Sequence, residues 1–276
     1  MVWRSSVDGI ELTFQLVGIN NQNFVMADRQ TGTWWQQVTG EAIRGPLAGK
    51  RLEPLPWDEV GFAIWRREHP RTQVLAGDPQ HHDSYRLGLE AGDDSAGSRG
   101  SFPTLGLAAG TALPEEALIV GVELGGSAKA YPLELLAEQT PVGDTLSGEP
   151  LLLWVAEDGL SVRGFSRRLD DRVLDFVRPA DDRALSGAEP IEPPTTAPLE
   201  GMPHAARDSP EATPWRAGGT LIDAQTGSTW SFSGEAISGP LAGRRLERLR
   251  VLKDYWFDWQ AYNLRNAIYS GGRLGG

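Results

Sequence analysis

The sequence contains no cysteine among its 276 residues, so disulfide bonds, thiolate chemistry and cysteine-ligated zinc or iron–sulfur sites are excluded. Histidine is scarce, with four residues, and the one cluster is His81-His82-Asp83. Adjacent histidines point in different directions on a regular element, so this cluster is a poor metal site. We therefore expect neither a bound metal nor another cofactor.

Long hydrophobic runs are also missing. No segment approaches the ~18 apolar residues of a membrane-spanning helix, and the opening MVWRSSVDGIELTF lacks the apolar stretch of a secretory signal. Acidic residues outnumber basic ones, since the chain has 37 Asp and Glu but 26 Lys and Arg, and its formal net charge is -11. This sign repels nucleic acid and disfavours docking on anionic lipid. We expect a cytoplasmic protein that reaches a membrane only through partners, or a periplasmic one if the chain is a processed form.

What the sequence does contain is an internal repeat. Residues 28–53 read DRQTGTWWQQVTGEAIRGPLAGKRLE, and residues 223–247 read DAQTGSTWSFSGEAISGPLAGRRLE. Within GEAIxGPLAGxRLE, 12 of 14 positions are identical. Two copies are too few for a solenoid, so they indicate a duplicated antiparallel β module in one globular body. Because Trp35 is equivalent to Trp230, we expect a pseudo-twofold arrangement of the two modules.

Residue patterns predict a mostly β fold with short helices, an α+β protein. Residues 10–16 alternate between apolar and polar side chains, which predicts a half-buried strand, and residues 10–38 read as a three-stranded meander. More strands are expected at 72–75, 117–123, 128–131, 150–155 and 161–165, and short helices at 59–69, 132–138 and 255–262, where Trp259 takes the place of Trp65.

Composition divides the chain into modules. Residues 77–116 are rich in Gly, Asp, Ser and Pro, which is typical of a linker. We expect a first, partial module over 1–76 and a second, complete module over 117–276. Residues 179–217 are a proline-rich irregular insertion within the second module.

The repeated residues allow two interpretations. Aromatic and acidic side chains could line a ligand site between the modules, formed by Trp34, Trp35, Glu41, Trp230 and Glu235. The simpler interpretation makes the paired tryptophans core anchors, lets Asp28 and Asp223 cap the QTG turns, and pairs each Glu with Arg51 or Arg245. The glycines and prolines then shape turns: Gly45, Pro46, Gly49, Gly239, Pro240 and Gly243.

These segments resemble a known family. The stretch over residues 28–56, followed by Trp65 and HPRTQVL, resembles the C-terminal signature of the bacterial domain-of-unknown-function family 3179. IVGVELGGSAKAYPLELL resembles its N-terminal signature, and DYWFDWQAYN resembles its usual ending. The resemblance covers the latter part of one module at about 4–76 and a whole module at 118–270. It implies a mixed, mostly β fold and no established reaction.

Departures from the family pattern are informative. Members commonly carry a histidine after the AYPL helix and a Cys-Pro-x-Cys segment after the next strand, and they often carry an export signal. Here the histidine position falls near Gln139 and Thr140, and the cysteine position falls near Trp154 to Glu157. The resemblance therefore implies that any metal or redox site of the family is absent from this chain.

Three functions follow as hypotheses. The first is a non-catalytic accessory subunit with a protein-interaction surface in a larger assembly, guessed to be a membrane-bound respiratory or photosynthetic complex. The second is a protein that binds a small polar or carbohydrate ligand. The third is a hydrolase that uses the repeated carboxylates, which needs two carboxyl groups ~5–10 Å apart in an open cleft. We favour the first, a protein that is not an enzyme.

Overall fold

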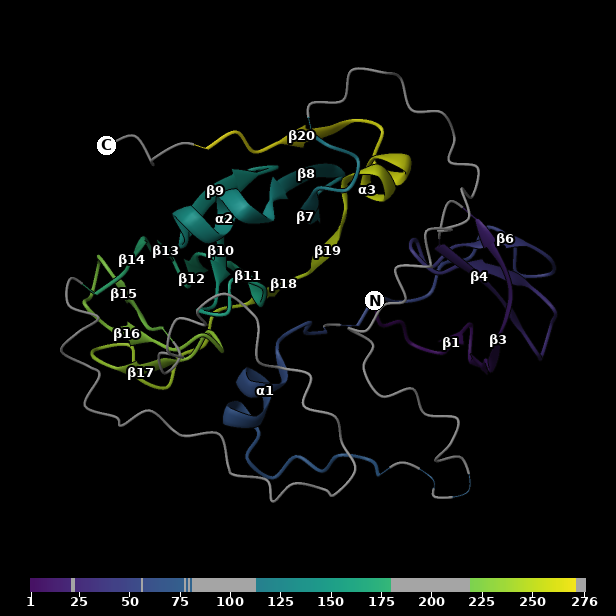
Figure 1. The fold of residues 1–276 in the computed structure, drawn as a ribbon, viewed down its shortest axis with the longest axis horizontal. Coiled ribbons are helices and arrows are strands. Elements are labelled where there is room, and N and C mark those ends of the chain that lie inside the picture. The colour runs from purple at the N-terminus through teal and green to yellow at the C-terminus, as the bar shows by residue number, and fades with distance from the viewer. Residues whose placement is uncertain are drawn as a thin grey trace.

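The computed structural model describes residues 1–20, 23–55, 57–76, 78, 80, 113–179 and 219–271. The described residues form several small, mostly antiparallel sheets and three short helices (Figure 1), so the prediction of a mostly β fold is confirmed. The His81-His82-Asp83 cluster, most of the expected linker and nearly all of the expected insertion lie outside the described residues.

The first repeat segment folds into a four-stranded antiparallel sheet. A short hairpin of β1 (Ser6–Val7) and β2 (Ile10–Glu11) precedes it. The sheet then runs in chain order through β3 (Phe14–Asn20), β4 (Asn23–Asp28), β5 (Trp34–Gln36) and β6 (Ala42–Arg44), which confirms the meander and adds one strand to it. We call this the first sheet.

The prediction of one half-buried strand over residues 10–16 was wrong. The chain leaves the β1–β2 hairpin at Leu12, whose side chain is buried beside Trp35, and a new strand begins at Phe14. Ile10 and Leu16, which were expected to be buried, are exposed. A bulge between Leu16 and Gly18 further shifts the register of β3 against β4.

Two further four-stranded sheets form the body. One has the order β19 (Val251–Tyr255), β7 (Leu118–Leu124), β8 (Ser127–Pro132) and β20 (Asn266–Ile268), with β20 parallel to β8. The other has the order β18 (Arg248–Leu249), β11 (Val162–Ser166), β10 (Glu149–Val155) and β9 (Val142–Leu146). Helix α2 (Leu133–Gln139) contributes Leu133 and Leu136 to the core that these two sheets share.

The second repeat segment folds like the first. A hairpin of β12 (Arg168–Leu169) and β13 (Arg172–Val173) precedes a sheet in the order β14 (Phe176–Val177), β15 (Leu221–Asp223), β16 (Thr229–Trp230) and β17 (Ala236–Ser238). We call this the second sheet. It lies at the opposite end of the long axis from the first sheet (Figure 1). The wider duplicated module and its pseudo-twofold arrangement stay predictions.

Each repeat is followed by a helix that contacts the other repeat. Helix α1 (Phe62–Glu68) follows the first sheet, yet its Ile64 is buried in one hydrophobic cluster with Trp230 of the second sheet. Helix α3 (Trp256–Tyr262) follows the second sheet, yet Tyr262 accepts a hydrogen bond from Gln36 of the first sheet at 2.9 Å. Each helix thus contacts the other repeat, which we call reciprocal docking, while Trp256 and Trp259 of α3 are also buried against β7 and β8 of their own half.

The strand expected at residues 72–75 is not formed, and this prediction was wrong. Val74 and Leu75 are 72% and 96% exposed. The corresponding residues after α3 form β20 because they pair with β8. No described strand lies beside residues 72–75 to give them the same pairing.

Candidate functional site

The best-defined side-chain constellation is a capped turn that occurs once in each repeat. In the first repeat, Asp28 accepts hydrogen bonds from the backbone N–H of Thr31 at 2.5 Å and from Trp35 Nε1 at 2.9 Å. Burial opposes ionisation of Asp28, but the donors Trp35 and Thr31 outweigh it and lower the pKa of this carboxyl. The carboxylate thus ties the QTG turn to the core tryptophan.

The second repeat makes the same contacts. Asp223 accepts from the Thr226 N–H at 2.6 Å and from Trp230 Nε1 at 2.9 Å. The glycine of each GPLAG segment packs against this turn: a Cβ on Gly45 would lie 2.8 Å from Thr33 Cα, and one on Gly239 would lie 2.6 Å from Ser228 Cα. Both glycines also have positive φ angles, which other residues rarely adopt. The close packing and the backbone conformation therefore each exclude a larger residue.

The structure does not bring the residues of the hypothesised ligand site together. Trp35 and Trp230 are fully buried, each in a different hydrophobic cluster. Trp34 is half-exposed, and the guanidinium of Arg44 lies 5.0 Å from the centre of its ring. These placements make the two buried rings core anchors rather than a stacking platform.

Glu41 and Glu235 are also far from each other, since they precede β6 and β17 at opposite ends of the molecule (Figure 1). Glu41 pairs with Arg51 at 3.4 Å, and Glu235 pairs with Arg245 at 2.5 Å. This arrangement offers no paired carboxylates for a hydrolase. The turn residues Gly49 and Gly243 have positive φ angles, and Pro46 and Pro240 lie in the same two turns.

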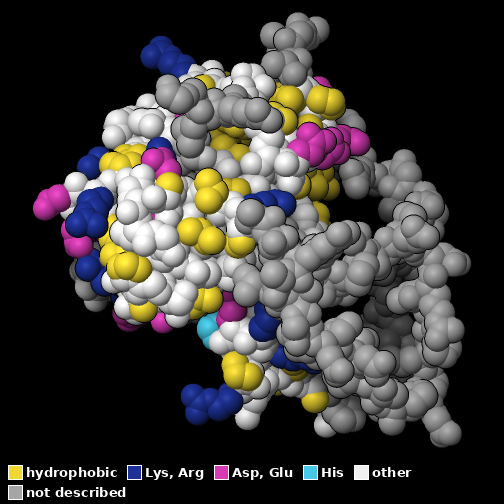
Figure 2. Space-filling model, turned by 90° about the vertical axis from the view of Figure 1, so that its left-hand side faces the viewer, with side chains coloured by type: hydrophobic (Ala, Val, Ile, Leu, Met, Phe, Trp, Pro, Cys, Tyr) yellow, Lys and Arg dark blue, Asp and Glu magenta, His cyan; other side chains and the backbone are white. Residues whose placement is uncertain are grey.

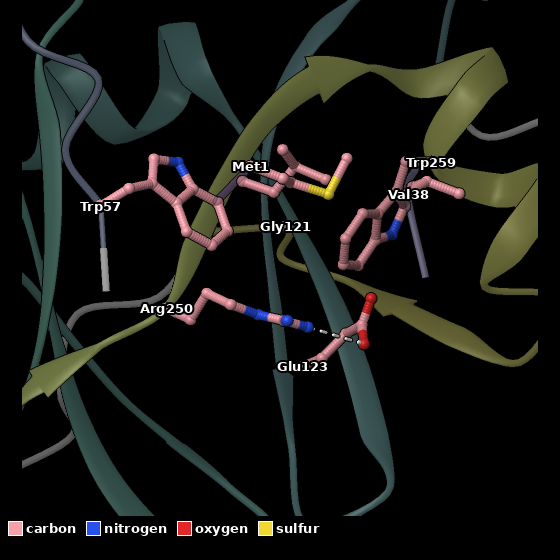
Figure 3. Close-up of a pocket in the computed structure, with 8 residues that line it drawn as sticks. Met1, Val38, Trp57, Gly121, Glu123, Arg250 and Trp259 are labelled. Atoms are coloured by element: carbon pink, nitrogen blue, oxygen red, sulfur yellow. Dashed lines mark hydrogen bonds and ion pairs between the residues drawn. The ribbon is translucent and has the colours of Figure 1, made fainter. Parts of the chain in front are cut away.

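A small pocket lies where the two halves meet (Figure 3). Trp57 and Trp259 stand on opposite sides of it, and Arg250 reaches across to Glu123 at 3.3 Å. The other lining residues are Met1, Val38, Gly121 and Leu252. Its cavity volume is about 10 Å³, which is space for about one water molecule and far below the roughly 300–1,000 Å³ of typical ligand pockets. The pocket fits side-chain packing better than a carbohydrate.

The positions that the family resemblance assigns to histidine and cysteine meet in space. Thr140 Oγ1 accepts a hydrogen bond from the Val155 backbone N–H at 2.9 Å. Next to it, Gln139 accepts one from the Tyr269 hydroxyl at 2.9 Å. Thr140 is buried, and so are Trp154 and Val155. Thr140 thus bonds to the backbone of β10, and Gln139 bonds to Tyr269 after β20.

One polar network lies beside these positions. Lys129 Nζ contacts Asp144 at 2.6 Å, and the Tyr131 hydroxyl donates to the same carboxylate at 2.8 Å. Burial and the Asp144 charge raise the pKa of Tyr131, while bonds from Lys129 and the Thr145 N–H outweigh burial and lower that of Asp144. The network joins β8, which carries Lys129 and Tyr131, to β9, which carries Asp144.

A second network joins α1 to the body. The Arg163 guanidinium is 1% exposed and contacts Asp58 at 2.6 Å and Glu68 at 2.6 Å. Arg248 also pairs with Asp58. Burial opposes the charge of Arg163, yet its two acidic partners outweigh burial and raise its pKa. The network fixes α1 on the second half through charge-assisted hydrogen bonds.

A buried acid pair lies at the other helix contact. Both Asp258 carboxylate oxygens lie within 2.8 Å of Asn23 Nδ2 on β4, and the charge of Asp258 reaches Asp254, which lies four residues earlier in the chain. Burial and the neighbouring Asp258 charge raise the pKa of Asp254 to about 7. Burial also raises the pKa of Asp258, against the lowering effect of Asn23. Sequence reasoning missed this pair, although Asp254 and Asp258 are spaced four residues apart in DYWFD.

The described part of the chain holds no group of three or more His, Cys, Asp or Glu side chains that could bind a metal ion. None of the described helices has the length and the apolar composition needed to cross a membrane.

The described residues form a mostly β protein with two similar four-stranded sheets and a body whose two sheets share a hydrophobic core. The family model described as "Protein of unknown function (DUF3179)" matches residues 1–265, and the chain belongs to this family. No curated protein and no solved structure matches the chain.

Proposed function

We propose that this protein is a non-catalytic accessory subunit that offers a protein-interaction surface to a larger assembly. One observation carries the proposal: hydrophobic side chains are exposed together on one face of the β3–β4 hairpin. Leu16, Ile19 and Phe24 are 59%, 47% and 44% exposed, and Met26 is half-buried. We call these four residues the hairpin face.

Strand register makes the hairpin face continuous. Leu16 pairs with Met26, and Ile19 pairs with Phe24, so the four side chains emerge on the same side of the sheet. Met26 also pairs with the buried Trp35, which places the hairpin face beside the core of the first repeat. Contiguous exposed hydrophobic side chains of this kind are typical of interaction sites.

The second repeat shows how the equivalent face of its own sheet is covered. Leu221 pairs with Trp230 as Met26 pairs with Trp35, yet Leu221 is only 1% exposed. It belongs to a cluster with Leu152 and Trp154 of β10, which cover this sheet. No described strand covers the first sheet in this way, and β3 is an edge strand that pairs with β4 alone. A partner protein that buries the hairpin face would therefore complete a packing that the second repeat already has.

The membrane-bound respiratory or photosynthetic complex remains part of this proposal as the assembly to examine first. None of the described helices could cross a membrane, so we propose that contact with such a complex is made through protein partners. The net charge of -11 favours the same route, because it disfavours direct contact with anionic lipid.

The test is co-purification from the native host with a tagged chain. Leu16→Ser, Ile19→Ser and Phe24→Ser combined remove the apolar side chains without adding charge. Val177→Ser and Ile237→Ser are the matched control, because these side chains are 51% and 55% exposed on the second sheet. That end of the molecule shows its hydrophobic side chains in several separate groups (Figure 2).

We expect the parent chain and the control to elute with defined partner chains in a complex larger than 30.0 kDa, and the triple variant to elute alone. The proposal fails if the parent elutes as a monodisperse monomer from gently solubilised cells. It also fails if the folded triple variant keeps the whole complex, because the hairpin face would then not be the contact.

A further inference from the structure

Helices α1 and α3 use the same side to reach the opposite repeat. When Trp65 is aligned with Trp259, the two seven-residue helices begin and end at equivalent positions, and Ile64 corresponds to Asp258. Ile64 is buried in the core of the second half, and Asp258 accepts a hydrogen bond from Asn23 of the first sheet. The equivalence of the two helices therefore holds in their contacts as well as in their sequence positions.

A second side of each helix carries two aromatic residues three positions apart. In α3 these are Trp256 and Trp259, whose exposed fractions are 4% and 2%. In α1 the equivalent residues are Phe62 and Trp65, whose exposed fractions are 54% and 37%. The same two aromatic positions are therefore covered in one half of the molecule and open in the other.

The β-hairpin of β7 and β8 covers the aromatic side of α3. Ile119 of β7 and Ala130 of β8 lie in one hydrophobic cluster with Trp256 and Trp259. Gly121 of β7 allows this close contact, because a Cβ at this position would lie 2.2 Å from the ring of Trp259. The β-hairpin thus presents a glycine and an alanine to two large rings.

The segment that follows each helix shows the same difference. After α3, β20 pairs with β8, Ile268 packs against the cluster of the two tryptophans, and Tyr269 is buried. The equivalent residues after α1 are Val74 and Leu75, which are almost fully exposed and lie beside no described strand. This segment therefore lacks the partner strand that β8 provides for β20.

One hydrogen bond joins the open segment to the open side of α1. Trp65 Nε1 donates to Thr72 Oγ1 at 2.9 Å, so residues 72–75 begin beside the indole. The exposed apolar side chains of the helix and the segment form one surface, which we call the α1 face: Phe62, Trp65, Val74 and Leu75. Helix α1 lies apart from β7 and β8 (Figure 1), so the β-hairpin that covers α3 does not cover the α1 face.

We propose that the α1 face binds an antiparallel β-hairpin of a partner protein in the way that α3 binds β7 and β8. The partner places a glycine or alanine against Trp65 and runs one strand parallel to residues 72–75. In every copy of this chain α3 already covers β7 and β8, so the partner is a different protein. This inference rests on the proposed function and adds to it a second contact surface and the element that the partner contributes.

Charge around the α1 face further describes the partner. Arg66, Arg67 and Arg71 are exposed in or just after α1. The one acidic residue between positions 62 and 75 is Glu68, which pairs with Arg163 at 2.6 Å. The surroundings of the face are therefore basic although the chain has a net charge of -11, and they favour a β-hairpin flanked by acidic side chains.

The test uses the chain's own β7–β8 sequence as a probe in place of the partner. The probe is a fluorescent, backbone-cyclised peptide of residues 118–132 whose strand pairing is verified by NMR, because an open two-stranded hairpin is only marginally stable in water. We expect saturable binding to the purified chain, measured by fluorescence anisotropy. Phe62→Ser combined with Leu75→Asp should weaken this binding at least about tenfold. A probe with Gly121→Val should not bind, because its side chain would collide with the indole of Trp65.

The matched control is Leu264→Asp, which changes a side chain that is 80% exposed after α3 and should leave binding unchanged. The substituted positions are exposed, so equal urea midpoints should show that the variants stay folded. The inference is overturned if the parent chain does not bind the probe, or if the double variant binds it as tightly as the parent. It is also overturned if Leu75→Asp instead abolishes a dimer of the chain or its binding to phosphatidylglycerol vesicles.

Thiol labelling in the native complex separates this inference from the proposed function. Val74→Cys adds a single thiol to a chain that has none, and it should react rapidly with a maleimide in the purified chain and slowly in the complex. Equal rates would overturn the inference and leave the accessory-subunit proposal standing. A slow reaction in the purified chain would also overturn it, because the chain would then cover its own α1 face. A chain that stays monomeric in its host would overturn both.

Discussion

The two helix contacts of this protein use opposite chemistry at equivalent positions. Helix α1 docks on the second half through Ile64 in a hydrophobic core and through Glu68, which pairs with Arg163 at 2.6 Å. Helix α3 is anchored on its own half by Trp256 and Trp259, and it reaches the first sheet through polar contacts of Asp258 with Asn23 and of Tyr262 with Gln36. The scaffold thus needs a docked helix at each place but does not need one particular set of side chains.

The hydrophobic clusters that contain Trp230 and Trp35 also differ, in this case in size. Trp230 lies in a cluster of eleven buried residues that includes β10 and α1, whereas Trp35 lies in a cluster of four. Both rings are fully buried and donate to an aspartate. The second repeat is therefore part of the main body, and the first is a smaller unit whose hairpin face stays open.

The largest expected effect is a loss of stability when either core tryptophan is replaced, and the loss should differ between the two. Trp230→Ala should lower the free energy of unfolding by about 3–5 kcal/mol, because it opens a cavity in the larger cluster and removes the donor to Asp223. Trp35→Ala should cost less, toward the lower end of that range, because fewer buried neighbours surround it. Urea unfolding of the two variants measures the difference, and equal losses would contradict the distinction between the two cores.

A smaller effect is expected at the ion pair of α1. Glu68→Gln removes the charged acceptor from Arg163 while Asp58 remains beside it, so we expect a loss of about 1.5–3 kcal/mol. Glu138→Gln, on the exposed side of α2, is the matched control and should change little. A Glu68→Gln variant as stable as its control would show that the apolar contact of Ile64 alone holds α1.

Local chemistry could be predicted from the sequence because it depends on residues close in the chain. The aspartates that cap the QTG turns and the glutamates that pair with arginines ten residues later were both expected, and the structure contains these contacts. The strand at residues 72–75 was predicted from composition alone and failed, because a strand needs a partner edge.

Long-range contacts could not be predicted. No local pattern joins Asn23 to Asp258 or Arg163 to Glu68, and the first pair is separated by 235 residues. The likeness of the repeats also extends beyond the recognisable residues. Asp8 and Asp170 have φ angles of 51° and 53° and pair with Lys50 and Arg244, yet the two hairpins that carry them share few identical residues.

Native-state hydrogen exchange of the two helices tests the reciprocal docking most directly. Asn23→Ala combined with Gln36→Ala should speed exchange of the amides in α3 and leave α1 unchanged, although α1 follows the mutated sheet in the chain. Arg163→Met should do the reverse and speed exchange in α1. If each variant instead changes exchange only in the helix of its own repeat, the contacts between the repeats do not hold the helices and the account of reciprocal docking is wrong.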